Sequence, residues 1–259
     1  MKTIVNTSVK TLENGIRSVL INDPKSYNSL SSVTLKSLLV VFKTLNKDNK
    51  TKVIILEGAG KGFSAGHNLK ELKKFKKKNE YKKLFNLCSE LMLEIVEGRK
   101  PVIAKVHGSA FAAGCQLAAS CDLALSTNDA MFATPGVNIG LFCSTPMVAL
   151  SRVVKNKHAM EMLLTGDFIQ ADKAKSIGLI NNFFKEENLT KETILMANKI
   201  ANKSSLTLSI GKKAFYNQSE MKISDAYKYA SEVMIKNMME SDSEEGIKAF
   251  IEKRKPNWN

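Results

Sequence analysis

The sequence predicts one α/β domain followed by a C-terminal helical module. Two observations support this prediction. Short apolar runs alternate with amphipathic helical segments through the first half of the chain, and from Ser144 onward the hydrophobic periodicity is mostly helical. Strands that alternate with helices form a largely parallel sheet, because each return to the same edge needs a crossover connection.

Each predicted element has a local signal. Ile16–Ile21 reads as a strand and is followed by the turn formers Asn22, Asp23 and Pro24. Ser31 or Ser32 can cap the next helix. Residues 53–56 form a continuous apolar run, which is typical of a strand buried on both faces. One stripe of that first helix would carry Leu35, Leu38, Leu39, Phe42 and Leu45. Further strands are predicted at Val102–Val106 and 123–125, and further helices at 81–96, 187–203, 205–217, 223–239 and 242–254.

Length, composition and charge exclude several classes of protein. The 259 residues are 44% hydrophobic, which is enough for a packed core and excludes a disordered chain. No apolar stretch approaches the roughly 20 residues of a membrane span, and the first residues contain no apolar signal region. We therefore expect a cytoplasmic protein, or an organelle matrix protein from which a transit peptide has been removed. No membrane partner is expected.

The net charge of +14 comes from 39 basic and 25 acidic residues, but only four of the basic residues are arginines. Arginine is the residue that favours base reading and bidentate phosphate contacts, so a nucleic-acid partner is not expected. The lysine-rich run at 70–78 keeps apolar spacing at Leu72 and Phe75. It can be a solvated helix face or a local phosphate-binding surface.

The cysteines and histidines indicate no metal site. Cys88, Cys115, Cys121 and Cys143 form no CxxC pair, and no histidine lies at metal-ligand spacing from them. We expect buried, reduced thiols. A methionine-rich stripe around Met234, Met238 and Met239 predicts a core or a subunit interface.

Two segments place small residues just beyond a predicted buried strand: 58–66 after one strand and 108–114 after another. Ligands of α/β sheets bind at such strand ends, where small residues let backbone N–H groups approach closely. Two such donors aimed at one oxygen would form an oxyanion hole. The glycines at 58, 60 and 62 alone are also compatible with a plain turn, and they do not open a helix as a dinucleotide-binding loop does.

Ordered motifs along the chain carry a family resemblance. Residues 63–72, Phe-Ser-Ala-Gly-His-Asn-Leu-Lys-Glu-Leu, are similar to an F-S/A-A-G-x-D-L-K-E motif. Residues 101–108 and 112–117 resemble a K-P-x-I-A-x-V-x-G…G-G-G-x-E-L block, and Asp122, Pro135, Gly140 and Gly166 follow in family order. The chain thus resembles the crotonase (enoyl-CoA hydratase/isomerase) superfamily over essentially its whole length.

The resemblance implies a crotonase-like spiral of ββα units at 1–200 and a C-terminal helical trimerisation module at 201–259, giving trimers or hexamers. It implies an acyl-CoA thioester as ligand, with coenzyme A as part of the substrate and no separate cofactor or metal. The backbone N–H groups of His67 and Ala113 would polarise the thioester carbonyl and stabilise an enolate. Contacts with the CoA portion are implied for Lys25, Ala65, Gly66, Asn68, Leu69, Lys70 and, from the C-terminal helix of the same or a neighbouring subunit, Lys253.

The sequence departs from the family pattern at the residues that would bind and activate water. Hydration needs two carboxylates as general base and general acid, and the two glutamate positions hold Gln116 and Gly136. Residues 130–160 contain no Asp or Glu. Cys143 is a speculative nucleophile or base, provided that its pKa is lowered, and the side chains of His67 and His107 are either structural or proton relays.

These departures leave several functions open. The chain is an enzyme of the hydratase/isomerase type with doubtful hydratase activity, a CoA-thioester isomerase, decarboxylase or hydrolase, or an acyl-CoA-binding protein without turnover. Replacing both Gln116 and Gly136 with glutamate would test whether the missing carboxylates limit hydration.

Overall fold

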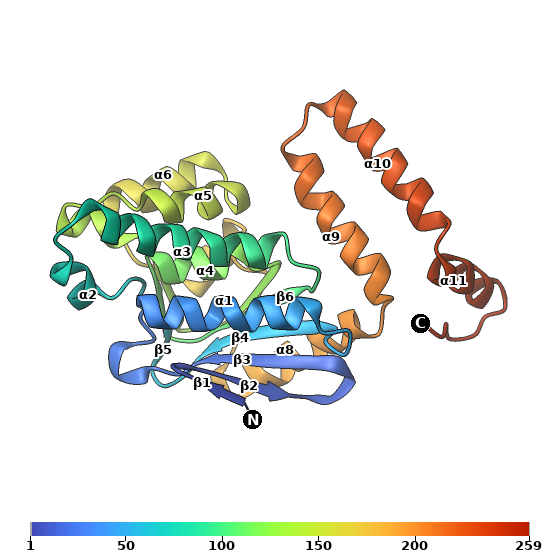
Figure 1. The fold of residues 1–259 in the computed structure, drawn as a ribbon, viewed down its shortest axis with the longest axis horizontal. Helices are drawn as coiled ribbons and strands as arrows, with labels where there is room; N and C mark the ends of the chain where they lie inside the picture. The colour runs from blue at the N-terminus through green and yellow to red at the C-terminus, as the bar shows by residue number, and fades with distance from the viewer. Residues whose placement is uncertain (1, 259) are drawn as a thin grey trace.

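The computed structural model describes residues 2–258, with side chains from residue 5. Met1 and Asn259, the outer limits of the two predicted domains, lie outside the described residues. The chain forms two sheets and a set of covering helices (Figure 1). The larger sheet has the strand order β1-β2-β3-β4-β6-β8-β11, and the smaller one has the order β10-β9-β7-β5.

The large sheet begins with antiparallel strands and continues with parallel ones. β1 (Lys2–Ile4), β2 (Thr7–Thr11) and β3 (Ile16–Ile21) pair antiparallel, whereas β4 (Val53–Gly58), β6 (Val102–Val106), β8 (Leu123–Thr127) and β11 (Asn182–Phe184) add in parallel. The prediction for 53–56 is confirmed. Ile54 and Leu56 pack into the larger core, while Val53 and Ile55 pack on the opposite face.

The short strands of the small sheet account for the spiral of ββα units that the resemblance implies. The parallel strands β4, β6 and β8 of the large sheet are each followed by a three-residue strand of the small one: β5 (Gly62–Ser64), β7 (Ser109–Phe111) and β9 (Met131–Ala133). β10 (Ile169–Gln170) closes the sheet, pairing antiparallel with β9. The segments 58–66 and 108–114, expected as loops, therefore each contain a strand. Strands this short carry too few alternating residues to be seen in the sequence.

Helices cover both faces of the large sheet. α1 (Ser32–Lys47) and α3 (Lys78–Val96) lie on one face, and α8 (Glu186–Ala201) lies on the other (Figure 1). Ser31 caps α1, because its hydroxyl accepts a hydrogen bond from the Thr34 N–H at 3.2 Å. The remaining helices of the body are α2 (Leu69–Lys74), α4 (Ala113–Ser120), α5 (Ser144–Val153), α6 (Asn156–Thr165) and α7 (Ala171–Ser176), with short 3-10 turns at Glu13–Gly15, Pro24–Ser26 and Pro135–Ile139.

The last three helices extend away from the sheets. α9 (Ser205–Ser219) and α10 (Ile223–Met238) form an antiparallel pair, and α11 (Ser241–Ile251) lies beyond them (Figure 1). Met234, Met238 and Met239 are exposed there, so this stripe is not a core of the single chain. The division of the chain at residue 200 and the trimerisation role of these helices stay predictions. Among residues 2–258, no helix combines the length and the apolar character that a bilayer crossing requires.

Asp122 joins α9 to the body. Its carboxylate accepts hydrogen bonds from the Val102 N–H and the Lys212 ammonium, both at 2.7 Å, and from the Tyr216 hydroxyl at 3.0 Å. Burial and the neighbouring Asp122 charge raise the pKa of Tyr216. Asp122 is therefore committed to the architecture and is not free for chemistry.

Candidate active site

The two segments with small residues meet at one edge of the small sheet. β5 and β7 pair in parallel, so their C-terminal ends lie side by side. Ala65, Gly66 and His67 follow the first strand, and Ala112 and Ala113 follow the second. The sheet thus brings together residues nearly 50 positions apart in the sequence.

Gly66 lies at a close approach between these segments. It has a φ of +86°, and a methyl group in its place would lie 2.8 Å from the Phe111 carbonyl oxygen and 3.1 Å from the Ala113 nitrogen. Only a residue without a side chain fits this conformation and this spacing. The backbone on either side of Gly66 is therefore held against the start of α4.

Two backbone donors are available at this junction. Ala113 is the first residue of α4, so its N–H has no carbonyl partner within the helix. Leu30 pairs with this loop by donating its N–H to the Gly66 oxygen at 2.8 Å, a register that leaves the His67 N–H unused. Within residues 2–258, neither N–H donates to a backbone carbonyl.

The Ala113 amide is oriented by a strained residue. Ala112 has φ +49° and ψ −117°, a conformation that residues other than glycine rarely adopt and that costs about 1–3 kcal/mol. The Ala112 N–H donates to the Ala133 oxygen at 2.9 Å, which ties the turn to β9. Gly114 completes the contact, because a methyl group there would lie 2.2 Å from the Ser64 oxygen. Backbone strain is typical of sites where orientation matters more than stability.

The His67 side chain turns toward α1 and α3. Its Nδ1 lies 3.2 Å from the Leu30 carbonyl oxygen, and its ring meets Phe85 edge to face with the centroids 5.4 Å apart. Burial lowers the pKa of His67, opposed by the Leu30 carbonyl and the Glu71 charge, so the imidazole is neutral at physiological pH. Its Nε2 is buried without a hydrogen-bond partner among the described residues. No sequence motif marks Leu30 or Phe85, because both contacts arise from tertiary packing.

Most of the residues expected to contact CoA lie in or beside the 65–70 loop, whereas Lys253 lies elsewhere in the chain. The Tyr27 carbonyl accepts the Ala65 N–H at 2.9 Å, which holds the exposed Lys25 segment beside the 65–70 loop. Leu69 and Lys70 are exposed at the start of α2, while the Asn68 side chain caps that helix by accepting the Glu71 N–H at 3.1 Å. Lys253 follows α11, far from α2 within one chain (Figure 1).

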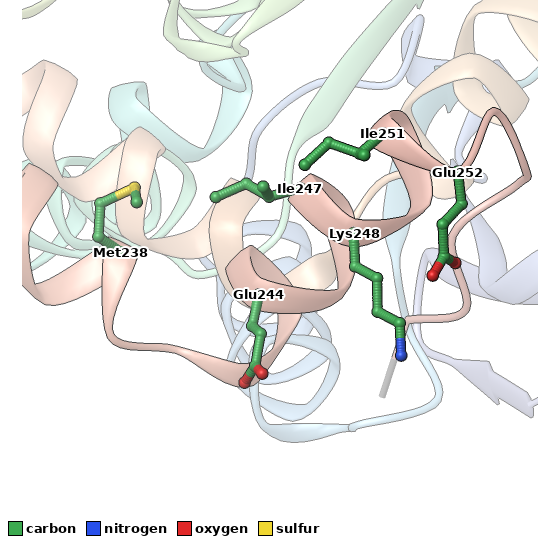
Figure 2. Close-up of a pocket in the computed structure, with 6 residues that line it drawn as sticks. All are labelled: Met238, Glu244, Ile247, Lys248, Ile251 and Glu252. Atoms are coloured by element: carbon green, nitrogen blue, oxygen red, sulfur yellow. The ribbon is translucent and has the colours of Figure 1, made fainter.

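A hollow on α11 is separate from this junction. Figure 2 shows Met238, Ile247 and Ile251 beside the charged side chains of Glu244, Lys248 and Glu252. It contains none of the residues expected at the site. In the part of the chain that the structure describes, no group of three or more His, Cys, Asp or Glu residues is arranged to hold a metal ion.

Comparison with known proteins decides the family. A family model described as enoyl-CoA hydratase/isomerase matches residues 11–259. The chain belongs to the enoyl-CoA hydratase/isomerase family. Among curated relatives, "Enoyl-CoA hydratase domain-containing protein 3, mitochondrial" of Xenopus laevis is 47% identical over 246 residues, covering 95% of this chain and 84% of the relative. The human protein of that name is 45% identical over 253 residues, covering 98% and 83%.

Solved structures of this family agree with the fold. The crystal structure of human enoyl Coenzyme A hydratase domain-containing protein 3 has a TM-score of 0.95 at 45% identity, covering 98% of this chain and 100% of that one. The crystal structure of enoyl-CoA hydratase from Mycobacterium smegmatis has a TM-score of 0.96 at 45% identity, covering 98% of both chains. The family resemblance and the crotonase-like fold expected from the sequence are confirmed.

Gln116, at the position where the resemblance leads us to expect the first glutamate, lies on the first turn of α4. Its N–H donates to the Ala112 oxygen at 3.0 Å, so the residue sits directly above the junction. The side chain is buried, and its Oε1 has no hydrogen-bond partner among the described residues. An amide has no acidic proton to give near neutral pH.

Gly136 is at the position expected for the second glutamate. It lacks a carboxylate, and the packing around it leaves no room for a side chain. It lies in the Pro135–Ile139 turn, and its carbonyl accepts the Leu141 N–H at 2.9 Å. A methyl group at Gly136 would lie 2.4 Å from the Leu141 oxygen and 2.9 Å from the Cys143 Sγ. Replacing Gly136 with glutamate would therefore disturb the turn as well as add a carboxylate, because backbone occupies the space of the side chain.

The cysteine at residue 143 does not replace the missing acids. Burial raises the pKa of the Cys143 thiol, and burial raises that of the neighbouring Cys115 to about 12. A thiol with a raised pKa stays protonated at neutral pH and is a poor nucleophile. A hydrogen bond with the Gly136 backbone lowers the pKa of Cys143, but the effect of burial is larger and the net shift is upward. All four cysteines are buried and free.

Proposed function

We propose that this chain binds an acyl-CoA thioester and polarises its carbonyl group with the N–H groups of His67 and Ala113. The observation that carries the proposal is the close approach at Gly66, which brings together, at a strand end, the two backbone segments that contain these unused donors. Two N–H groups directed at one oxygen stabilise the negative charge that develops on a thioester enolate. Loss of one such donor typically costs 10²–10³ in rate.

The proposed chemistry is enolate formation without efficient hydration. Hydration requires acids that hold and activate water, and residues 116 and 136 supply none. Isomerisation, decarboxylation and thioester hydrolysis use the same oxyanion hole with other accessory groups. Hydratase activity is accordingly expected to be weak compared with one of these reactions.

Basic side chains around the site fit the phosphates of CoA. Lys25, in the segment beside the 65–70 loop, and Lys70, at the end of that loop, are both exposed, and lysine interacts with phosphate as a point charge. Lys253 would reach a CoA molecule only in a neighbouring subunit. The exposed apolar residues Met239, Phe250 and Ile251 on the C-terminal helices support such self-association, as a trimer or hexamer.

Acyl-CoA binding without turnover is the second candidate function. The absence of Asp and Glu from 130–160, together with the closed space at Gly136, favours it. Such a protein would use the same pocket to sense or sequester thioesters. The printed names of the relatives include the word mitochondrial, and we propose an organelle matrix as the location of either function.

Ala113→Pro tests the oxyanion hole. Proline removes the N–H, and the first position of a helix tolerates proline. Glu186→Pro at the first position of α8 is the matched control, because it makes the same change far from the junction. Turnover of crotonyl-CoA, a 3-enoyl-CoA and malonyl-CoA should be measured together with calorimetric affinity for each.

Three results distinguish the candidates. Turnover that falls at least about 100-fold in Ala113→Pro and not in Glu186→Pro, with equal melting temperatures, supports the enzyme. Affinity without turnover in the wild-type chain supports the binding protein. Turnover that survives Ala113→Pro unchanged contradicts the proposed oxyanion hole.

A further inference from the structure

The His67 imidazole carries an unsatisfied hydrogen-bond acceptor on the same residue whose backbone N–H is proposed for the oxyanion hole. Its Nδ1 faces the Leu30 carbonyl oxygen at 3.2 Å. A carbonyl oxygen only accepts hydrogen bonds, so Nδ1 must carry the proton. In the neutral ring, Nε2 is then left with a lone pair and no proton.

Two contacts and burial hold the ring in this state. Leu30 fixes the tautomer, Phe85 of α3 packs edge-on against the ring, and burial favours the neutral form. Glu71 of α2 is the charged group whose field reaches the imidazole, and its carboxylate already accepts the Ser32 N–H at 3.0 Å. Among the described residues, no donor reaches Nε2.

A second unmatched acceptor lies on the adjoining helix. The buried Oε1 of Gln116 also lacks a partner among the described residues. Side chains in a helix lean toward the preceding turn, which here contains Ala112 and Ala113. A buried acceptor without a donor is unfavourable, and a bound ligand that supplies a donor removes that penalty.

We propose that His67 Nε2 is a specificity-determining acceptor that selects acyl thioesters carrying a hydroxyl group near the thioester carbonyl. The inference rests on the proposed function, because the backbone N–H of the same residue is assigned to that carbonyl. A ligand group that meets the imidazole would then belong to the part of the acyl chain nearest the carbonyl, and the α and β positions are the ones that we test. Gln116 Oε1 offers a second acceptor for the same end of the ligand.

A buried acceptor discriminates strongly between a ligand that carries a hydroxyl group and the analogue that lacks it. A site built to pair with a hydroxyl rejects the analogue that lacks it, because the buried acceptor stays unpaired. A purely apolar pocket would show the reverse order, since it gains nothing from the hydroxyl and must desolvate it. The sign of the preference therefore reports whether Nε2 is used.

The first experiment compares ligands that differ by one oxygen. Affinities of the full-length wild-type chain for butyryl-CoA, 2-hydroxybutyryl-CoA, 3-hydroxybutyryl-CoA and free CoA are measured by calorimetry. We expect one hydroxylated thioester to bind about tenfold or more tightly than butyryl-CoA. Equal or weaker binding of both overturns the inference while leaving the proposed function intact. If no thioester binds better than free CoA, the proposed function fails as well.

The second experiment separates the two ring nitrogens. In His67→Asn the side-chain amide can still donate to the Leu30 oxygen but provides nothing at the position of Nε2. In His67→Gln the amide oxygen reaches that position and the donation to Leu30 is lost. Both variants keep the backbone N–H. We expect the preference for the hydroxylated ligand to fall to about onefold in His67→Asn and to remain above that value in His67→Gln.

Controls exclude a merely structural role. If His67 only shapes the loop, His67→Gln binds all ligands more weakly than His67→Asn. The ratio of the affinities for the hydroxylated thioester and butyryl-CoA then stays at the wild-type value in both His67 variants. That result overturns the inference. His107→Asn is the matched histidine control, since the His107 Nε2 already pairs with the Gly60 oxygen at 2.8 Å. It should leave the ratio at the wild-type value.

Discussion

Gly136→Ala adds one methyl group, and its effect on stability follows from the distances around that residue. The new Cβ would lie 2.4 Å from the Leu141 oxygen, about 1 Å inside the 3.4–4 Å of ordinary van der Waals contact, and 2.9 Å from the Cys143 Sγ. Leu141 is anchored to Gly136 by its own N–H, so the clash is with fixed backbone. Overpacking of this kind costs about 1–3 kcal/mol of the free energy of unfolding.

Gly211→Ala is the matched control, with the opposite expected sign. Gly211 lies within α9, and a methyl group there meets nothing within 4 Å. Alanine should stabilise the helix by about 0.5–1 kcal/mol. Urea unfolding followed by circular dichroism, at one protein concentration for all chains, measures both differences from the midpoints.

The same geometry makes a prediction about catalysis. Gly136→Glu brings the same Cβ and a carboxylate, so the double variant Gln116→Glu/Gly136→Glu should unfold more easily and gain little crotonyl-CoA hydration. Gln116→Glu alone adds a buried carboxyl group, whose pKa burial raises. An unchanged midpoint for Gly136→Ala, or strong hydration by a stable double variant, would refute the packing argument at this turn.

Three further predictions concern other parts of the structure. Asp122→Asn should destabilise the chain by about 2–4 kcal/mol in urea unfolding, because the Lys212 ammonium, nearly buried beside it, loses its charged partner; a loss below about 0.5 kcal/mol would contradict the assigned tie to α9. Gly114→Ala should lower turnover or thioester affinity at least about tenfold by forcing α4 away from Ser64, 2.2 Å from the new Cβ; wild-type values would count against the close contact. Because the pKa of His67 in the folded state lies below the ordinary histidine value of 6.5, its neutral form stabilises the fold above that pH, and this contribution is lost as the pH falls through the lowered value. Melting temperatures measured from neutral to acidic pH should therefore fall more steeply for the wild-type chain than for His67→Gln, and parallel curves would argue against the burial of the ring.

Local sequence signals were sufficient for the regular elements. Ile16–Ile21, the α1 stripe with its Ser31 cap, and the doubly buried run at 53–56 all follow from residue type and periodicity. The predicted boundaries were less accurate: α3 begins at Lys78 rather than at residue 81, and β8 continues to Thr127. The three-residue strands β5 and β7 have no local signal, because pairing with each other and not their own composition keeps them extended.

What the sequence by itself determined is the order of strands and helices, the family motifs and the identity of Gln116 and Gly136, since these depend on residue type and on spacing along the chain. Only the tertiary structure decided that Gly66 touches the Ala113 amide, that His67 donates to Leu30 and leaves Nε2 unmatched, and that Leu141 fills the space beside Gly136. Those facts concern atoms from segments far apart in the chain. Their distances are set by how the two sheets and the helices pack together, which no window of sequence contains.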